Sequence, residues 1–116
     1  MNIEFYREYC LSKPATSEHL PFDENTLVFK VADKMFALCD INKFEGINLK
    51  CDPERAEELR EQYDGIRPGY HMSKKHWNTV DVKGSVSDKL ILDLIDHSYE
   101  LVFQSLPKKV REAILS

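Results

Sequence analysis

The amino-acid sequence predicts an α+β domain in which an antiparallel β-sheet packs against helices. The first observation is a run of three short strand-like segments within residues 26–51, joined by links too short to hold a crossover helix. The second is a set of helix signals over residues 3–12, 53–63 and 88–105. The third is size. A chain of 116 residues, 42% of them hydrophobic, can build one core, so we expect a compact single domain over residues 1–116.

The chain is expected to begin with a helix and a loop. Asn2 is a suitable N-cap for a helix over residues 3–12, and Lys13-Pro14 ends it. Five residues recur at helical spacing and are expected to face the core: Ile3, Phe5, Tyr6, Tyr9 and Cys10. Residues 14–25 contain several turn formers and predict a loop.

The next three segments predict an antiparallel meander. Residues 26–31 place apolar side chains on one face, and a tight connection at Ala32-Asp33-Lys34 leads to residues 35–39. A loop then leads to residues 47–51, where apolar and polar residues alternate again. Strands joined by such short links pair as antiparallel neighbours.

A second helix is predicted over residues 53–63. Asp52 provides the N-cap, Pro53 suits the first turn, and Gly65 marks the C-terminal stop. We expect the inward residues to be Ala56, Leu59 and Tyr63. We expect the solvent-facing residues to be Glu57, Glu58, Arg60 and Glu61.

A fourth strand and two more helices complete the prediction. Residues 77–82 have strand character, and Ser87 caps a long helix over residues 88–105. The apolar stripe of this helix is Ile91, Leu94, Ile95, Ser98 and Val102. Pro107 opens a short last helix, whose packing residues we expect to be Val110, Ala113, Ile114 and Leu115.

Composition narrows the class of protein. The apolar runs are too short for a transmembrane helix, and the acidic, amphipathic start does not match a signal peptide. Cys10, Cys39 and Cys51 form an odd set without CxxC spacing, which favours reduced thiols in a cytoplasmic protein. The formal net charge of −4 argues against a constitutively tight nucleic-acid binder.

One segment departs from this acidic average. Residues 65–83 hold four basic residues against a single acid, Asp81, and so carry a charge of +3. The same segment contains the only Trp of the chain, Trp77, and two of its four His. A local excess of basic charge on an acidic body can bind an anion there.

The same segment carries a recognisable motif, RPGYHMSKKHWNTV, which is followed by a Ser-Tyr pair at Ser98-Tyr99 and by Leu106-Pro107. In this order these residues resemble the MmcQ/YjbR family. The matching residues of the motif are Arg67, Pro68, His71, Met72, Ser73, Lys74, His76, Trp77 and Val80. The N-terminal half is similar too, with its Tyr-Cys-Leu-x-Lys-Pro and Pro-Glu-x-Ala-Glu-x-Leu-Arg patterns. The resemblance implies a fold like CyaY (frataxin-like) and a double-wing DNA-binding protein.

The functional hypothesis is weak, mostly non-specific DNA binding through residues 67–77 and the wing-like turn at Lys83-Gly84. Lysine and arginine would contact phosphates, histidine would donate a hydrogen bond, and Trp77 or Tyr70 would stack on a base. The candidate nucleic-acid-binding residues are Arg67, Tyr70, His71, Lys74, Lys75, His76, Trp77 and Lys83. Lys30 and Lys50, on predicted strands, would extend the patch. The alternative is that Trp77 and His71 anchor the loop while the lysines are ordinary solvated charges.

Other functions have less support. No nucleophile stands beside a base and an orienting group, so we expect no enzyme, and no cofactor is implied. His71-x4-His76 lacks a third metal ligand, and His97 near Asp93 and Asp96 is expected on a solvated helix face, so no metal site is predicted. The second hypothesis is a monomeric module that binds a protein or a small anion with the same patch. DNA binding requires the basic residues to converge on one surface, whereas a small ligand requires a concave pocket.

Overall fold

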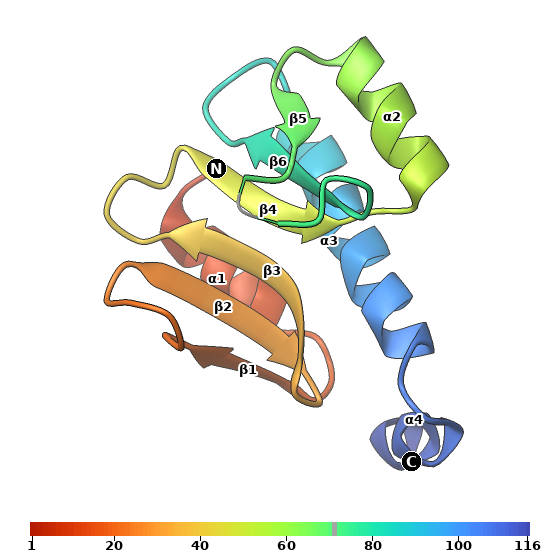
Figure 1. Cartoon of the computed structure of the whole chain (residues 1–116). Helices are drawn as coiled ribbons and strands as arrows, with labels where there is room; N and C mark the ends of the chain where they lie inside the picture. Colours follow the sequence, from red (N-terminus) through yellow and green to blue (C-terminus); the bar gives the residue numbers. More distant parts are fainter. Residues whose placement is uncertain (71) are drawn as a thin grey trace.

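Six antiparallel strands form one sheet in the computed structural model, which describes residues 1–70 and 72–116 (Figure 1). The order across the sheet is β1-β2-β3-β4-β6-β5. The strands are β1 (Thr16–His19), β2 (Thr26–Val31), β3 (Lys34–Asp40), β4 (Gly46–Lys50), β5 (Ile66–Pro68) and β6 (Trp77–Asp81). The helices are α1 (Ile3–Leu11), α2 (Pro53–Gln62), α3 (Asp88–Gln104) and α4 (Lys108–Leu115). The α+β class and the packing of an antiparallel sheet against helices are confirmed.

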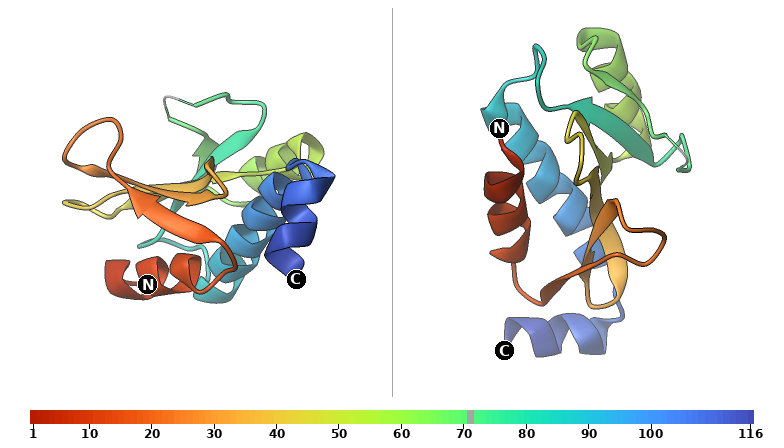
Figure 2. Two further views of the ribbon diagram at one scale, coloured as in Figure 1. Left: turned by 90° about the horizontal axis from the view of Figure 1, so that it is seen from below. Right: turned by 90° about the vertical axis from the view of Figure 1, so that its left-hand side faces the viewer.

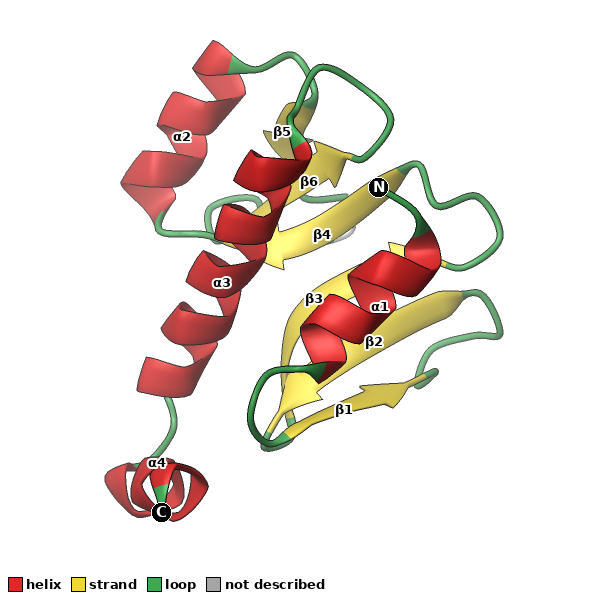
Figure 3. Ribbon diagram, turned by 180° about the vertical axis from the view of Figure 1, so that it is seen from behind, coloured by secondary structure: helices red, strands yellow, loops and turns green. Residues whose placement is uncertain are grey.

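The helices lie on one face of the sheet. Figure 3 shows α1 and α3 in front of the strands, with α2 beside them. The main core is buried between these helices and the inner strand faces, and its largest fully buried members are Tyr6, Phe29, Phe36, Ile47, Leu49, Ile91 and Ile95. The other face carries no helix (Figure 2), and we call it the open face. None of the helices in the described chain is long and apolar enough to span a membrane.

Local sequence signals set most of the element boundaries. The side chain of Asn2 accepts a hydrogen bond from the Phe5 N–H, that of Asp52 from Arg55, and that of Ser87 from Leu90. Each of these caps satisfies a backbone donor that has no partner inside the helix. The three helix starts predicted from the sequence are therefore confirmed.

Two strands were not predicted. The loop expected over residues 14–25 contains β1, which pairs along its whole length with β2. Its sequence, TSEH, has no apolar alternation that would predict a strand. The segment is a strand because its backbone pairs with β2 at the edge of the sheet. Strand β5 is only three residues long and pairs with β6, so it leaves almost no periodic signal.

The last helix packs less than the sequence predicts. Val110 and Ile114 are half-buried against the core, but Ala113 is exposed and Leu115 is 73% exposed. The exposure of Ala113 and Leu115 follows from the position of α4. Figure 1 shows that α4 lies beyond the end of α3, away from the sheet, so only one side of it meets the domain.

A buried serine hydroxyl links β3 and β4 beyond the end of their hydrogen-bonded ladder. The ladder between β3 and β4 has three residue pairs, Ala37 with Leu49, Leu38 with Asn48 and Cys39 with Ile47. Past that ladder, the Ser98 hydroxyl of α3 donates to the Phe36 carbonyl at 2.5 Å and accepts from the Lys50 N–H at 2.9 Å. Ser98 is fully buried, so its place in the apolar stripe reflects hydrogen bonding to two strands.

His97 is another residue whose environment differs from the prediction. It is half-buried, and its Nε2 accepts a hydrogen bond from the Asp52 N–H at 3.1 Å, joining α3 to the start of α2. Only the neutral imidazole can accept at this nitrogen. Burial lowers the pKa of His97 below its ordinary value of 6.5, and the nearby Arg55 charge acts in the same direction.

This contact predicts a loss of stability in acid. The unfolded chain takes up a proton at His97 near pH 6.5, before the folded chain does, so the imidazole contribution is complete above that pH. It is lost as the pH falls from there through the lowered native pKa. We expect His97→Gln, which keeps an acceptor but does not titrate, to show a flatter decrease in the free energy of unfolding between about pH 7.5 and about pH 5. Urea unfolding at both pH values measures this, and identical slopes for the two proteins would contradict it.

Candidate nucleic-acid interface

The open face is defined by rows of paired residues. One row crosses all six strands: His19, Val28, Leu38, Asn48, Thr79 and Arg67 are successive partners. Directly paired residues share a face of the sheet. Residues two positions further along each strand lie on the same face, about 7 Å away.

One end of this face is basic. Lys50 pairs with Trp77, and Lys30 pairs with Met35, both in the row beside the one described above. The turn that precedes β6 adds Lys74, Lys75 and His76, all of them exposed. We call Lys30, Lys50, Lys74, Lys75 and His76 the basic end. β2 and β6 are three inter-strand steps apart in the sheet, or about 14 Å. This distance is enough to span several phosphates along one strand of DNA.

Arg60 of α2 fixes the turn that carries these lysines. Its guanidinium donates to Asn78 Oδ1 at 2.7 Å, to the Lys74 carbonyl, and to the Trp77 carbonyl at 3.3 Å. The His76 carbonyl accepts from the Cys51 N–H at 2.8 Å. The sequence prediction that Arg60 belongs to a solvated face was wrong, because its charge satisfies backbone carbonyls at the start of β6.

Trp77 supports the open face from within. It is 8% exposed and packs with Val28 and Leu38, while Met35 and Met72 cover the same cluster. A methyl group at Gly69 would lie 2.8 Å from the Trp77 Cβ, so glycine is required where the two strands approach. A buried indole cannot stack on a base, and the structure therefore gives Trp77 the anchoring role that the sequence left as the alternative.

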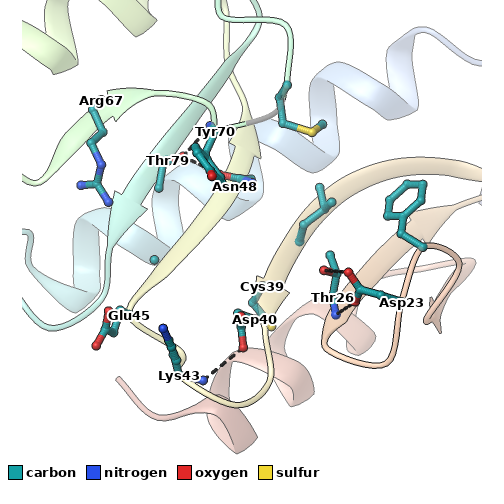
Figure 4. A pocket seen from close by; sticks show the side chains of 14 residues that line it. Asp23, Thr26, Cys39, Asp40, Lys43, Glu45, Asn48, Arg67, Tyr70 and Thr79 are labelled. Atoms are coloured by element: carbon teal, nitrogen blue, oxygen red, sulfur yellow. Dashed lines mark hydrogen bonds between the residues drawn. The ribbon is translucent and has the colours of Figure 1, made fainter.

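The other end of the face is hollowed into a groove of about 800 Å³ (Figure 4). One wall comes from β4, β5 and β6 and includes Asn48, Arg67 and Thr79. The opposite wall includes Leu38 and Thr26. Two loops border the groove, one through Phe22 and Asp23 and the other through Tyr70 and Met72. The described parts of both loops project from the side of the sheet away from α1 and α3 (Figure 2).

The charges of the groove are mixed, and acids predominate. Its lining holds the carboxylates Asp23, Asp40 and Glu45 against Lys43 and Arg67. Backbone N–H groups of residues 25 and 26 donate to Asp23 and lower its pKa, so this side chain stays ionised. An acidic lining of this kind disfavours a small anionic ligand.

Two of the predicted phosphate contacts lie away from the basic end. Arg67 donates from Nη1 to Asp81 at 2.8 Å, so its charge is already paired at the groove wall. Lys83 is exposed but lies past the opposite end of β6 from Lys74 and Lys75, across about 13 Å of strand. The convergence that DNA binding requires is therefore met only in part, because Arg67 and Lys83 lie apart from the other basic residues. Lys74, Lys75 and His76 are together, with Lys30 and Lys50 beside them.

Two predicted site residues remain, Tyr70 and His71. Tyr70 borders the groove, is 69% exposed, and its N–H donates to Thr79 Oγ1 at 3.1 Å. His71 lies outside the described residues. Sequence reasoning missed Phe22, Asn48 and Thr79 as groove residues. Asn48 and Thr79 are polar residues of β4 and β6 that only the strand register pairs. Phe22 lies in the loop before β2, where no local sequence pattern marks it as a groove residue.

The three cysteine thiols lie in the interior of the described chain. Cys10, Cys39 and Cys51 are free and buried. Burial raises the pKa of Cys39 to about 12 and that of Cys51 to about 11, which keeps both protonated. Among the described residues, no three His, Cys, Asp or Glu side chains are grouped to hold a metal ion.

The fold and the open face together define an α+β domain with a helix-free, concave sheet surface. The chain belongs to the YjbR family, whose model matches residues 11–101. It is 34% identical to the uncharacterised protein YjbR of Escherichia coli over 99% of this chain and 98% of that one. It is 35% identical to the uncharacterised protein YbdF of Escherichia coli over 96% of this chain and 92% of that one.

Solved structures agree with this assignment. A Deinococcus radiodurans protein described as a DUF419 domain superposes with a TM-score of 0.92 at 41% identity, over 97% of this chain and 87% of that one. A Pseudomonas syringae protein superposes with a TM-score of 0.74 at 32% identity, over 87% of this chain and 98% of that one. The resemblance to the MmcQ/YjbR family seen in the sequence is confirmed.

Proposed function

We propose that this protein is a non-enzymatic nucleic-acid-binding protein that contacts DNA phosphates through the basic end of its open face. The observation that carries the proposal is the position of four lysines at one end of the helix-free sheet surface. Lys74 and Lys75 are exposed in the turn before β6, half-buried Lys50 pairs with Trp77 at the start of β6, and half-buried Lys30 lies on β2. The Arg60 contacts hold the turn in place, so less side-chain and loop entropy is lost on binding.

The expected affinity is low and depends on salt. Each phosphate contact to duplex DNA contributes about 0.9 to the slope of log K against log salt. Three contacts therefore predict a loss of about 40-fold between about 50 and about 200 mM salt. The formal net charge of −4 weakens the long-range attraction further.

Removing two of the lysines tests the proposal. We expect Lys74→Ala/Lys75→Ala to weaken binding of a labelled duplex about tenfold at about 50 mM salt and to lower the salt slope by about 2. The matched control is Lys108→Ala/Lys109→Ala, which removes two exposed lysines from α4, away from the open face. Fluorescence anisotropy measures both. Equal losses in the two variants, or wild-type binding without a salt slope, would contradict phosphate contact at the basic end.

A further inference from the structure

We propose that the groove accepts one unpaired nucleobase, so that the protein binds single-stranded DNA more tightly than duplex. This inference rests on the proposed function, because the phosphates would lie at the basic end. The groove begins in the next row of the sheet. Asn48 and Thr79 are two residues from Lys50 and Trp77, or about 7 Å along their strands. A sugar joins phosphate and base over a distance of this scale.

The groove offers surfaces on which a base can stack. Phe22 on one loop is 64% exposed and Tyr70 on the other is 69% exposed, and both border the groove. Half-buried Met72 adds apolar surface to the groove. Exposed aromatic side chains stack bases with little dependence on sequence.

A polar group is available for the base edge. Thr79 Oγ1 donates to Asn48 Oδ1 at 2.5 Å, which fixes the orientation of the Asn48 amide. Within residues 1–70 and 72–116, no group accepts a hydrogen bond from the Asn48 amide nitrogen, which lines the groove. It can therefore donate to a base acceptor.

The acidic lining decides which part of a nucleotide enters. Asp23, Asp40 and Glu45 repel a phosphate, whereas an uncharged base carries no such penalty. A base within a duplex is paired and stacked, and the loop residues Phe22, Asp23, Tyr70 and Met72 border the groove. Entry from a duplex would require the base to be flipped out, which costs unpairing and unstacking energy. A single strand avoids that cost.

The test compares three oligonucleotides of equal length: a single strand, the same strand with abasic sites, and the duplex. Anisotropy is measured for the wild type, Phe22→Ser/Tyr70→Ser, Lys74→Ala/Lys75→Ala, and Leu115→Ser as a control that removes an equally exposed apolar side chain elsewhere. We expect the groove variant to lose about tenfold for the single strand and nothing for the duplex. We expect the wild type to lose about the same factor on the abasic strand, with no further loss in the groove variant.

The outcomes separate the two proposals. If the groove variant binds the single strand like the wild type while the lysine variant is weakened, the nucleobase inference is overturned and phosphate binding stands. If the lysine variant binds every probe like the wild type, or the wild type binds none of them at low salt, both proposals are overturned. Because Phe22 and Tyr70 are exposed, thermal unfolding is expected to stay near that of the wild type and to confirm that the groove variant is folded.

Discussion

Replacing Trp77 by alanine is expected to lower the free energy of unfolding by about 4 kcal/mol, in the range of large aromatic truncations in a packed interior. The indole fills the space between Val28, Leu38 and the turn before β6, and only 8% of the residue is exposed. Its removal leaves a cavity on the face of the sheet that carries no helix. Met35 and Met72 pack against the same cluster and can fill only part of that space.

The Trp77 prediction is checked by urea unfolding together with a second variant. Trp77→Phe keeps most of the packing and is expected to remain folded, with DNA binding equal to that of the wild type. Such a result would assign Trp77 to packing. A folded Trp77→Phe protein that loses binding about tenfold would instead show that the indole stacks on a base, contrary to its burial.

Replacing Ser98 by alanine is expected to cost about 3 kcal/mol. The substitution removes few atoms, so the cost does not come from a cavity. It comes from the Lys50 N–H and the Phe36 carbonyl, which both lose their partner in a fully buried site. Each unsatisfied buried group costs about 1–3 kcal/mol.

A matched serine separates this effect from helix propensity. Ser105→Ala removes a hydroxyl that donates to the Val102 carbonyl at the exposed end of α3, and we expect a change within about 0.5 kcal/mol. Urea midpoints of the two variants measure the difference. If Ser98→Ala unfolds at the wild-type midpoint, the hydroxyl does not bridge β3 and β4.

Elements with strong local signals could be predicted from the sequence. The caps at Asn2, Asp52 and Ser87 and the alternation in β2 and β4 are properties of short segments, so they survive in the structure. β1 and β5 could not be predicted, because their partners, not their own side chains, hold them as strands.

The site was only partly accessible to sequence reasoning, for a related reason. Lys74, Lys75 and His76 are adjacent in the chain, so their clustering is local. Whether Arg67 joins them depends on the register of β5 against β6 and on its ion pair with Asp81. Whether Lys83 joins them depends on the length of β6, which separates it from Lys74 and Lys75. The groove depends on register as well.

The most direct test of the central claim is to map binding onto the backbone. The amide chemical shifts of the isotope-labelled protein would be recorded as an unlabelled single-stranded oligonucleotide is added at low salt. We predict the largest shifts at Lys50, residues 73–77 and the groove strands, with α1 and α4 unchanged. Shifts concentrated on the helices, or none at millimolar oligonucleotide, would contradict nucleic-acid binding at the open face.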